Sequence, residues 1–331
     1  MGSRANFVLI DDDGLRLHYS HWAATQIWSM LVAGPDAASR YIAAQNLCDP
    51  ETGWLDDVWC EGGAVVDHTT RRLVFFGDEL RWELTAKRAF MALLPLTWPG
   101  WTVRWAYDGV GDLAAASDVD RSVVRRPFED EWLLPDTALP ADHDDAVHLL
   151  TVVSGGVTAY PLPDEIHTGW HGPRLLNRLP AGGLARVELP ELPASGLHID
   201  AGARAVGVWL TDHCAGLVPA LHEQWPGWHV EFWEDRYEEQ LDRCRGAVTA
   251  TVPVPDPATA LDELVSNLGD RIGHDPMPAN LALLAERLKE RPTDRVEVNP
   301  YLNEHRHVDP TAQEWAAVLR AADELRARLG G

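Results

Sequence analysis

The chain has 331 residues, of which 46% are hydrophobic and 24% charged, a composition typical of a folded protein with a buried core. Its formal net charge of −23 makes non-specific binding to nucleic acid or anionic lipid unfavourable, because both carry the same sign. An acidic surface is suited instead to a basic protein partner, although solubility alone would also account for it.

The N-terminal residues lack the apolar segment of a secretory signal, and no apolar run approaches the roughly 18 residues that span a bilayer. The four cysteines form no Cys-x-x-Cys pair and are too few for a disulfide scaffold; they are Cys48, Cys60, Cys214 and Cys244. We therefore expect reduced thiols, a cytoplasmic location and no membrane contact.

The first half of the chain contains two patterns that predict β-hairpins. Residues 6–20 and 61–77 each place short runs of alternating apolar residues on either side of a turn. A helical connection separates the two hairpins, and a second helical segment follows them. The sequence Trp-Pro-Gly-Trp at 98–101 then precedes a strand at 102–109.

The second half repeats this order of patterns. Hairpins are predicted at 149–162 and 195–212, and a helical segment leads to a second Trp-Pro-Gly-Trp at 225–228. The strand that follows begins at His229, as the earlier one begins at Thr102. Each half thus predicts a hairpin-helix-hairpin-helix-strand unit.

Several residues match when the two Trp-Pro-Gly-Trp motifs are aligned. At one constant offset, three apolar positions and one acidic position coincide: Phe90 with Leu217, Met91 with Val218, Leu94 with Leu221, and Asp108 with Asp235. The second hairpins match as well, through Asp67 with Asp200 and, within one residue, Arg72 with Arg204. We therefore predict an α+β fold with two tandem copies of one small unit, a pseudo-two-fold duplication.

This alignment divides the chain into four segments. They are a first repeat at 1–116, a linker or wrapping arm at 117–145, a second repeat at 146–246, and a C-terminal segment at 247–331. The last segment begins with a proline-rich connection and continues with amphipathic helices, two of which start at Asp256-Pro257 and Asp309-Pro310. A third helix is predicted between them, around Leu281–Leu288. We expect these helices to pack on the repeats.

The Trp-Pro-Gly-Trp motifs have two interpretations. Proline ends a helix and glycine permits a reversal, so the motif fits a helix-to-strand turn fixed by two buried indoles. Fifteen tryptophans also favour an aromatic cleft that could take a small molecule, with Trp101, Trp105, Trp170, Trp228 and Trp233 as candidate binding residues. Tryptophans outside the turns that could line a groove are Trp22, Trp28, Trp54, Trp59 and Trp82.

Histidines and carboxylates give weaker candidates. His167 and His171 form an H-x3-H pair, and His305 and His307 flank an arginine, so these four are the candidate metal ligands. A zinc or hydrolytic site needs three or four ligands that converge, and these pairs lie in different segments. Candidate catalytic residues are Asp67, Asp200, His167 and His171, although surface, packing and turn-capping roles are the simpler interpretation.

The chain carries none of the familiar motifs for phosphate, dinucleotide, zinc-protease or serine-hydrolase chemistry, and no basic stripe for nucleic acid. We expect no cofactor. The sequence therefore favours a non-enzymatic acidic binding or accessory protein that engages a basic protein partner, as immunity or neutralising factors do. The alternative is an enzyme of an unfamiliar family, such as a metal-dependent hydrolase, with a Trp/His/Asp-lined site between the repeats.

Overall fold

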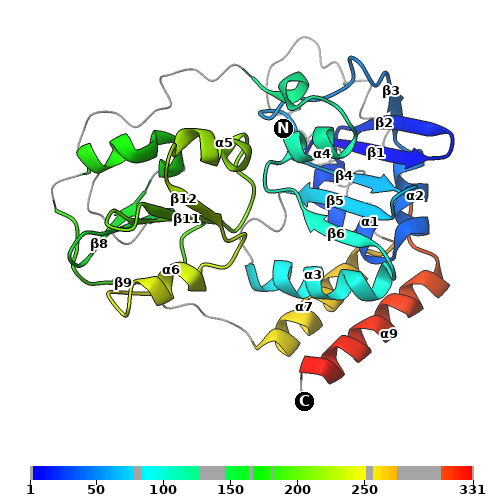
Figure 1. Ribbon diagram of the computed structural model, residues 1–331. Coiled ribbons are helices and arrows are strands. Elements are labelled where there is room, and N and C mark those ends of the chain that lie inside the picture. The colour runs from blue at the N-terminus through cyan, green and yellow to red at the C-terminus, as the bar shows by residue number, and fades with distance from the viewer. Residues whose placement is uncertain are drawn as a thin grey trace, which may run out of the picture.

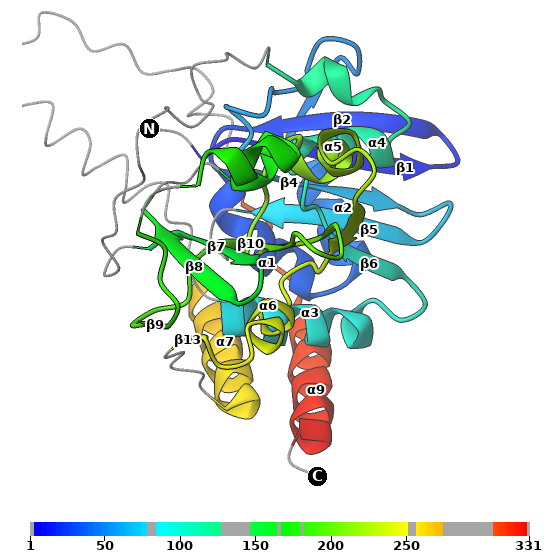
Figure 2. The same ribbon diagram turned by 60° about the vertical axis from the view of Figure 1, so that its left-hand side comes forward.

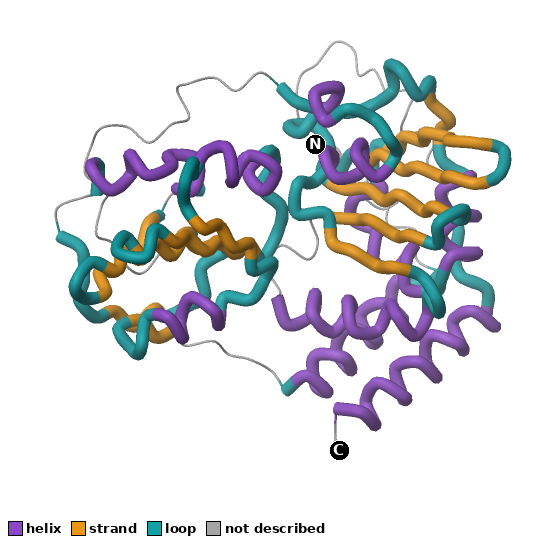
Figure 3. The backbone as a smooth tube through the Cα atoms, viewed as in Figure 1, coloured by secondary structure: helices purple, strands orange, loops and turns teal. Residues whose placement is uncertain are grey.

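The computed structural model describes residues 3–77, 84–126, 146–163, 167–179, 182–250, 256–273 and 307–329. Two β-sheets lie in two halves of the molecule, and each has helices packed on it (Figure 1). Both halves contain strands as well as helices (Figure 3). The predicted α+β class is confirmed.

The first half is built on a six-stranded sheet with the order β3-β2-β1-β4-β5-β6. Its strands are β1 (Ala5–Asp11), β2 (Gly14–Ser20), β3 (Asn46–Cys48), β4 (Gly62–Asp67), β5 (Arg72–Gly77) and β6 (Thr102–Trp105). The hairpins predicted at 6–20 and 61–77 are β1-β2 and β4-β5, both antiparallel.

Helices cover both faces of this sheet. Their bounds are η1 (Ala23–Gln26), α1 (Ile27–Val32), α2 (Pro35–Ala43), α3 (Leu84–Thr97), α4 (Val110–Ala116) and η3 (Arg121–Val124). Gly62 lies close to Ile27 on one face of β4, and its neighbour Gly63 lies close to Leu113 of α4 on the other. Because successive side chains of a strand point to opposite faces, α1 and α4 pack on opposite sides of the sheet.

The second half is built on a five-stranded sheet with the order β12-β11-β10-β7-β8. Its strands are β7 (His148–Val153), β8 (Val157–Leu162), β10 (Ser195–Asp200), β11 (Ala205–Leu210) and β12 (His229–Phe232). The associated helices are η5 (Thr168–Asn177), α5 (Leu217–Gln224) and α6 (Glu238–Arg243). A separate two-stranded sheet pairs β9 (Val187–Leu189) with β13 (Val248–Ala250).

The two main sheets share one strand order and one pairing sense. In the order β2-β1-β4-β5-β6 and in the order β8-β7-β10-β11-β12, the pairs are successively antiparallel, parallel, antiparallel and parallel. The strand β3 is an addition at one edge of the first sheet. Left-handed backbone recurs at matched places, in Arg71 and Arg204 and again in Asp118 and Arg245. Arg204 therefore aligns with Arg71, and Arg72 aligns with Ala205.

The C-terminal helices pack on the first half. Helix α7 (Pro257–Arg271) and helix α9 (Ala312–Leu329) contact α3 and each other, and lie side by side beneath it (Figure 2). Leu261 of α7 and Val318 of α9 are fully buried in the main core. Packing of these two helices on the first unit is therefore confirmed, whereas the helix predicted around Leu281–Leu288 falls outside the described residues.

Part of the segment expected to be a linker is folded onto the first half. Arg121 and Arg125 both ion-pair with the buried Asp108, and Asp57 accepts a hydrogen bond from the backbone N–H of Arg126. The remainder of that segment, 127–145, falls outside the described residues. Among the described helices, none has the length and apolar character needed to cross a membrane.

Candidate binding site

Each Trp-Pro-Gly-Trp motif forms a turn with its first indole buried. Trp98 and Trp225 are 0% and 1% exposed, and their Nε1 atoms donate to the carbonyl oxygens of Leu31 and Gly169, at 2.7 and 2.8 Å. The second indoles, of Trp101 and Trp228, are half-buried and pack edge-on against the first, with ring centroids 4.9 and 5.2 Å apart. These contacts support the interpretation of the motif as a structural turn.

The glycine of each motif is required by the turn. Gly100 and Gly227 have φ values of 78° and 75°, a region that side chains other than glycine seldom adopt. The predicted end of the helix, the reversal and the start of the strand are all present in both halves.

The other candidate tryptophans lie in different surroundings. Trp105 is 2% exposed and lies under the ammonium group of Lys87, at 4.2 Å from its ring centroid. Trp170 is half-buried beside Gly216. Trp233 is 4% exposed and lines a pocket in the second half. Trp82 falls outside the described residues.

His167 and His171 are buried in the second half. His167 packs edge-on against His148, with ring centroids 4.4 Å apart, and its Nδ1 accepts the backbone N–H of Gly169. Burial lowers the pKa of His167 to about 3 and also lowers the pKa of His171, so both rings are neutral at pH 7. These contacts are those of packing histidines.

The described residues contain no group of three or more His, Cys, Asp or Glu side chains arranged to hold a metal ion. His307, the one described member of the second histidine pair, contacts Asp309 at 2.7 Å, and His305 falls outside the described residues. Within the described part of the chain, the histidines considered as candidate metal ligands are therefore not brought together.

Asp67 and Asp200 each cap the turn of their own hairpin. Asp67 accepts hydrogen bonds from the backbone N–H groups of Thr69 and Thr70 and ion-pairs with Arg72 at 3.4 Å. Asp200 accepts a hydrogen bond from the backbone N–H of Ala203 at 2.8 Å. Such contacts are typical of aspartates in turns, and they give each residue a local role.

The contact between the halves is filled by protein groups. The buried Nζ of Lys87 donates to the carbonyl oxygen of Thr211 at 2.8 Å, and the carboxylate of Asp108 accepts the backbone N–H of Gly216 at 2.6 Å. Arg88 forms two hydrogen bonds to Glu238, at 2.7 and 3.0 Å. Burial lowers the pKa of Lys87 to about 8. The whole residue is only 1% exposed.

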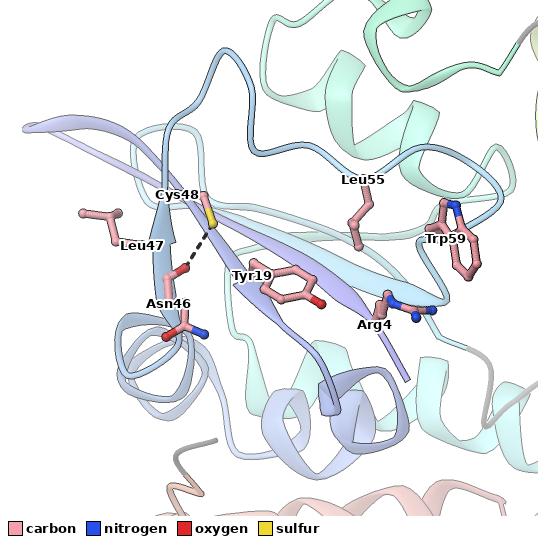
Figure 4. A pocket seen from close by; sticks show the side chains of 7 residues that line it. All are labelled: Arg4, Tyr19, Asn46, Leu47, Cys48, Leu55 and Trp59. Carbon is pink, nitrogen blue, oxygen red and sulfur yellow. Dashed lines mark hydrogen bonds between the residues drawn. The ribbon is translucent and has the colours of Figure 1, made fainter. Parts of the chain in front are cut away.

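A pocket of about 670 Å³ lies on the first half, at the edge of the sheet formed by β3 (Figure 4). Cys48 and Leu47 mark one end of it, and Arg4 and Trp59 mark the other, with Tyr19 and Leu55 between. Asn46 completes the lining. The volume is in the range of sites that bind a small ligand or the side chains of a partner.

The loop 49–61 that walls this pocket is held in place by part-buried and exposed hydrogen bonds. Asn6 is fully buried; its side chain donates to the carbonyl oxygen of Gly53 at 3.3 Å and accepts the backbone N–H of Leu55 at 2.7 Å. Asp56 accepts the backbone N–H groups of Val58 and Trp59, both at 3.0 Å. The pocket is therefore preformed, because its wall is fixed by groups that would otherwise be unsatisfied.

Exposed apolar side chains lie at the two ends of this pocket, Leu47 at one end and Trp59 at the other. Leu47 is 67% exposed and Trp59 is 46% exposed, and Val58, next to Trp59, is 57% exposed. The indole of Trp59 lies between two guanidinium groups, with Arg4 at 4.5 Å and Arg126 at 5.8 Å from its ring centroid. Arg126 is also ion-paired with Asp56 at 2.8 Å. Large exposed apolar side chains around one pocket are typical of an interaction surface.

From the sequence, Trp59 is only one of several tryptophans that could line a groove, and the other residues of this pocket are not predicted. Arg4, Tyr19 and Leu47 lie on three separate strands or strand ends, and nothing in their spacing indicates that they meet. The one available signal was the pair of apolar residues Val58 and Trp59 inside an acidic loop, where burial is not expected.

Comparison of the chain with family models, with curated proteins and with solved structures found no match.

Proposed function

We propose that this chain is a non-enzymatic binding protein, and that the pocket at β3 receives an apolar side chain of a protein partner. The observation that carries the proposal is a pocket with the exposed side chains of Leu47 and Trp59 at its two ends and exposed Val58 next to Trp59. Interfaces concentrate their binding energy in a few such anchors, and tryptophan is prominent among them.

The proposed partner is basic. The net charge of −23 attracts a cationic protein over a distance, and two exposed carboxylates, of Asp49 and Glu51, follow β3 directly. Cationic residues that flank the anchor would lie against this rim. Such long-range attraction raises the association rate and weakens as salt is added.

The lining of the pocket favours binding over catalysis. Among the described residues that line it there is no histidine, aspartate or glutamate to act as a general acid or base. Burial raises the pKa of the Cys48 thiol, which makes it a poor nucleophile at neutral pH. The alternative enzyme with a site between the halves has less support, because Asp67 and Asp200 cap their own hairpin turns and His167 packs against His148.

We further propose that the two halves are copies of one unit, with segments at 1–116 and 146–246. The shared strand order, the shared pairing sense and the matched left-handed residues support this duplication. The matched Trp-Pro-Gly-Trp turns support it as well, because their buried indoles and hydrogen bonds are the same in kind.

The binding proposal is tested with the full chain as bait in a lysate of its source organism, at low and at moderate salt. Trp59→Ala and Leu47→Asp alter the pocket, and Leu319→Asp is the matched control because Leu319 is an exposed apolar residue on α9. Circular dichroism establishes that each variant is folded.

We expect the parent chain and the control variant to capture one basic protein, and the pocket variants to lose it. Direct titration with that protein should then show affinity reduced by about tenfold or more, the usual effect of removing a central aromatic anchor. Capture that is equal for all four chains, or no saturable capture by any of them, would overturn the proposal.

A further inference from the structure

A second pocket, of about 560 Å³, lies on the second half at the turn ends of its sheet. The residues that line it come from the β7-β8 turn, from β10, β11 and β12, and from the end of α6; the polar ones are His198, Asp200, Glu231, Arg243 and Arg245. It is separate in the chain from the pocket at β3, whose lining comes from residues 4–59. Its chemistry also differs, because it is rich in ionisable groups.

Three residues that line this pocket differ from those at the matched positions of the first half. Val65 faces Val74 across the β4-β5 pair, and both are buried beneath α4. At the matched positions of the β10-β11 pair, His198 faces Gly207. Arg72 likewise aligns with Ala205. Polar or small residues in the second half thus stand where the first half has two buried valines and an arginine.

Trp233 forms one wall of the pocket and requires a glycine beneath it. A Cβ atom at Gly207 would lie 1.8 Å from the Trp233 ring, so the indole rests directly on the backbone of β11. The Trp233 Nε1 donates to Glu231 at 2.9 Å, and the guanidinium of Arg243 lies 4.4 Å above the ring. These three contacts hold the Trp233 indole in position at the wall of the pocket.

Of the four charged residues of the lining, two form an ion pair with each other and two do not. Glu231 ion-pairs with Arg243 at 2.8 Å, and Arg243 also contacts Glu239 at 2.6 Å. Asp200 has no ion pair with any described residue. In the first half the matched Asp67 pairs with Arg72, but the position that matches Arg72 in the second half is Ala205. Arg245 likewise has no ion pair among the described residues. One carboxylate and one guanidinium therefore line the pocket without charged partners.

His198 contributes a neutral hydrogen-bonding group. It is 5% exposed and lines the pocket, and its Nδ1 lies 2.8 Å from the hydroxyl oxygen of Thr151. Among the described residues no partner is present for Nε2. Burial lowers the pKa of His198 to about 4, so the ring carries no charge at pH 7.

We propose that this pocket binds a small zwitterion of the amino-acid class, with its ammonium group at Asp200, its carboxylate at Arg245 and a hydrogen bond to His198. Asp200 is half-buried and Arg245 is exposed. A zwitterion pairs with both charges at once, whereas a simple anion or cation pairs with only one of them. The volume accommodates a molecule of this size. This second pocket would therefore bind a small molecule, whereas the pocket at β3 is proposed to bind a protein partner.

The test is isothermal titration of the full chain with a series of probes at pH 7 and low salt. Glycine, 4-aminobutyrate and 6-aminohexanoate carry both charges at increasing separation. Butylamine and butyrate carry one charge each. We expect at least one zwitterion to bind with a dissociation constant of about 1 mM or lower, and both single-charge probes to bind about tenfold more weakly or worse.

Variants then assign the contacts. Asp200→Asn and Arg245→Gln should each weaken the best zwitterion by about tenfold. Ala205→Arg restores the arrangement of the first half, where Arg72 pairs with Asp67, and should abolish binding. Asp118→Asn is the matched control, because Asp118 occupies the position of Arg245 in the first half, and it should bind as the parent does.

Circular dichroism and thermal unfolding establish that each chain is folded before titration. Ala205→Arg keeps the test decisive if Asp200→Asn unfolds, since it leaves the turn contacts of Asp200 in place. Failure of every zwitterion to bind at about 10 mM overturns the proposal, as does binding that these variants leave unchanged. Binding of the single-charge probes as tightly as the zwitterions overturns it too.

Discussion

The two halves share a strand order, but the residues on the matched face of their sheets differ. In the first half, Val65 and Val74 are covered by α4, and the carboxylate of Asp67 is paired with Arg72. In the second half, His198 and Gly207 occupy the matched positions and line an open pocket. The same strand order thus accommodates both sets of residues, whereas the polarity and charge of this sheet face differ between the halves.

The halves differ at their edges too. Only the first sheet carries the added strand β3 and the acidic loop 49–61, and these build the pocket with exposed Leu47 and Trp59. The first half also packs against α7 and α9. One half thus presents an apolar surface and the other an ionisable pocket, on sheets of the same connectivity.

The largest expected effect tests what the halves have in common. Trp98→Ala and Trp225→Ala each remove a fully buried indole and its hydrogen bond. Each should lower the free energy of unfolding by about 4 kcal/mol, and by similar amounts, as large core truncations do. Urea denaturation of the two variants measures this. A difference of more than about 2 kcal/mol would mean that the two turns are not equivalent in energy.

The next effect should separate the halves. Asp108 is 1% exposed and bound by Arg121, Arg125 and the Gly216 N–H, whereas the matched Asp235 lies 3.6 Å from Arg88 and is partly exposed. Asp108→Ala leaves two guanidinium groups without their buried partner and should cost about 3 kcal/mol. Asp235→Ala should cost about 1 kcal/mol or less. Equal losses in urea denaturation would contradict this contrast.

Acid should weaken the second half more than the first, because most of the buried histidines lie there. Burial lowers the pKa of His167 to about 3 and of His198 to about 4, below the value of about 6.5 in an unfolded chain. As the pH falls below about 6.5, the unfolded chain takes up protons that the folded chain does not, so stability decreases.

From pH 7 to pH 5 the loss should be about 2 kcal/mol for each of these two histidines. Urea denaturation at the two pH values measures it, and His167→Gln with His198→Gln should reduce the dependence by about 4 kcal/mol. An unchanged dependence in that double variant would show that other groups control the acid response.

The smallest effect concerns the contact between the halves. Burial lowers the pKa of Lys87 to about 8, whereas a lysine in an unfolded chain titrates near 10.4. Between these values the folded chain releases the proton and the unfolded chain keeps it, so stability should rise with pH. From pH 7.5 to pH 9 the gain should be about 1 kcal/mol.

Lys87→Met is the control for this effect, because methionine fills a similar volume without a titrating group. The difference in the free energy of unfolding between parent and variant should change by about 1 kcal/mol over that pH interval. A constant difference would mean that Lys87 is neutral, or fully charged, throughout the interval.

The local elements and their order can be predicted from the residues alone. Hairpin turns at Asp67–Arg72 and Gly155-Gly156, and the reversals at Pro99-Gly100 and Pro226-Gly227, follow from residues whose backbone preferences are strong. The amphipathic helices α7 and α9 were likewise set by the spacing of their apolar residues. These features depend on neighbours in the chain, so a single sequence is enough.

Which side chains meet depends on the long-range packing of the chain. Arg4, Tyr19, Leu47 and Trp59 share one pocket because β3 pairs with β2 and because buried Asn6 fixes the loop 49–61. The charge state of the second pocket depends on whether an arginine or an alanine faces an aspartate across a hairpin. Long-range pairing and burial control both, and neither leaves a periodic signal in the chain, so the sites became visible only in three dimensions.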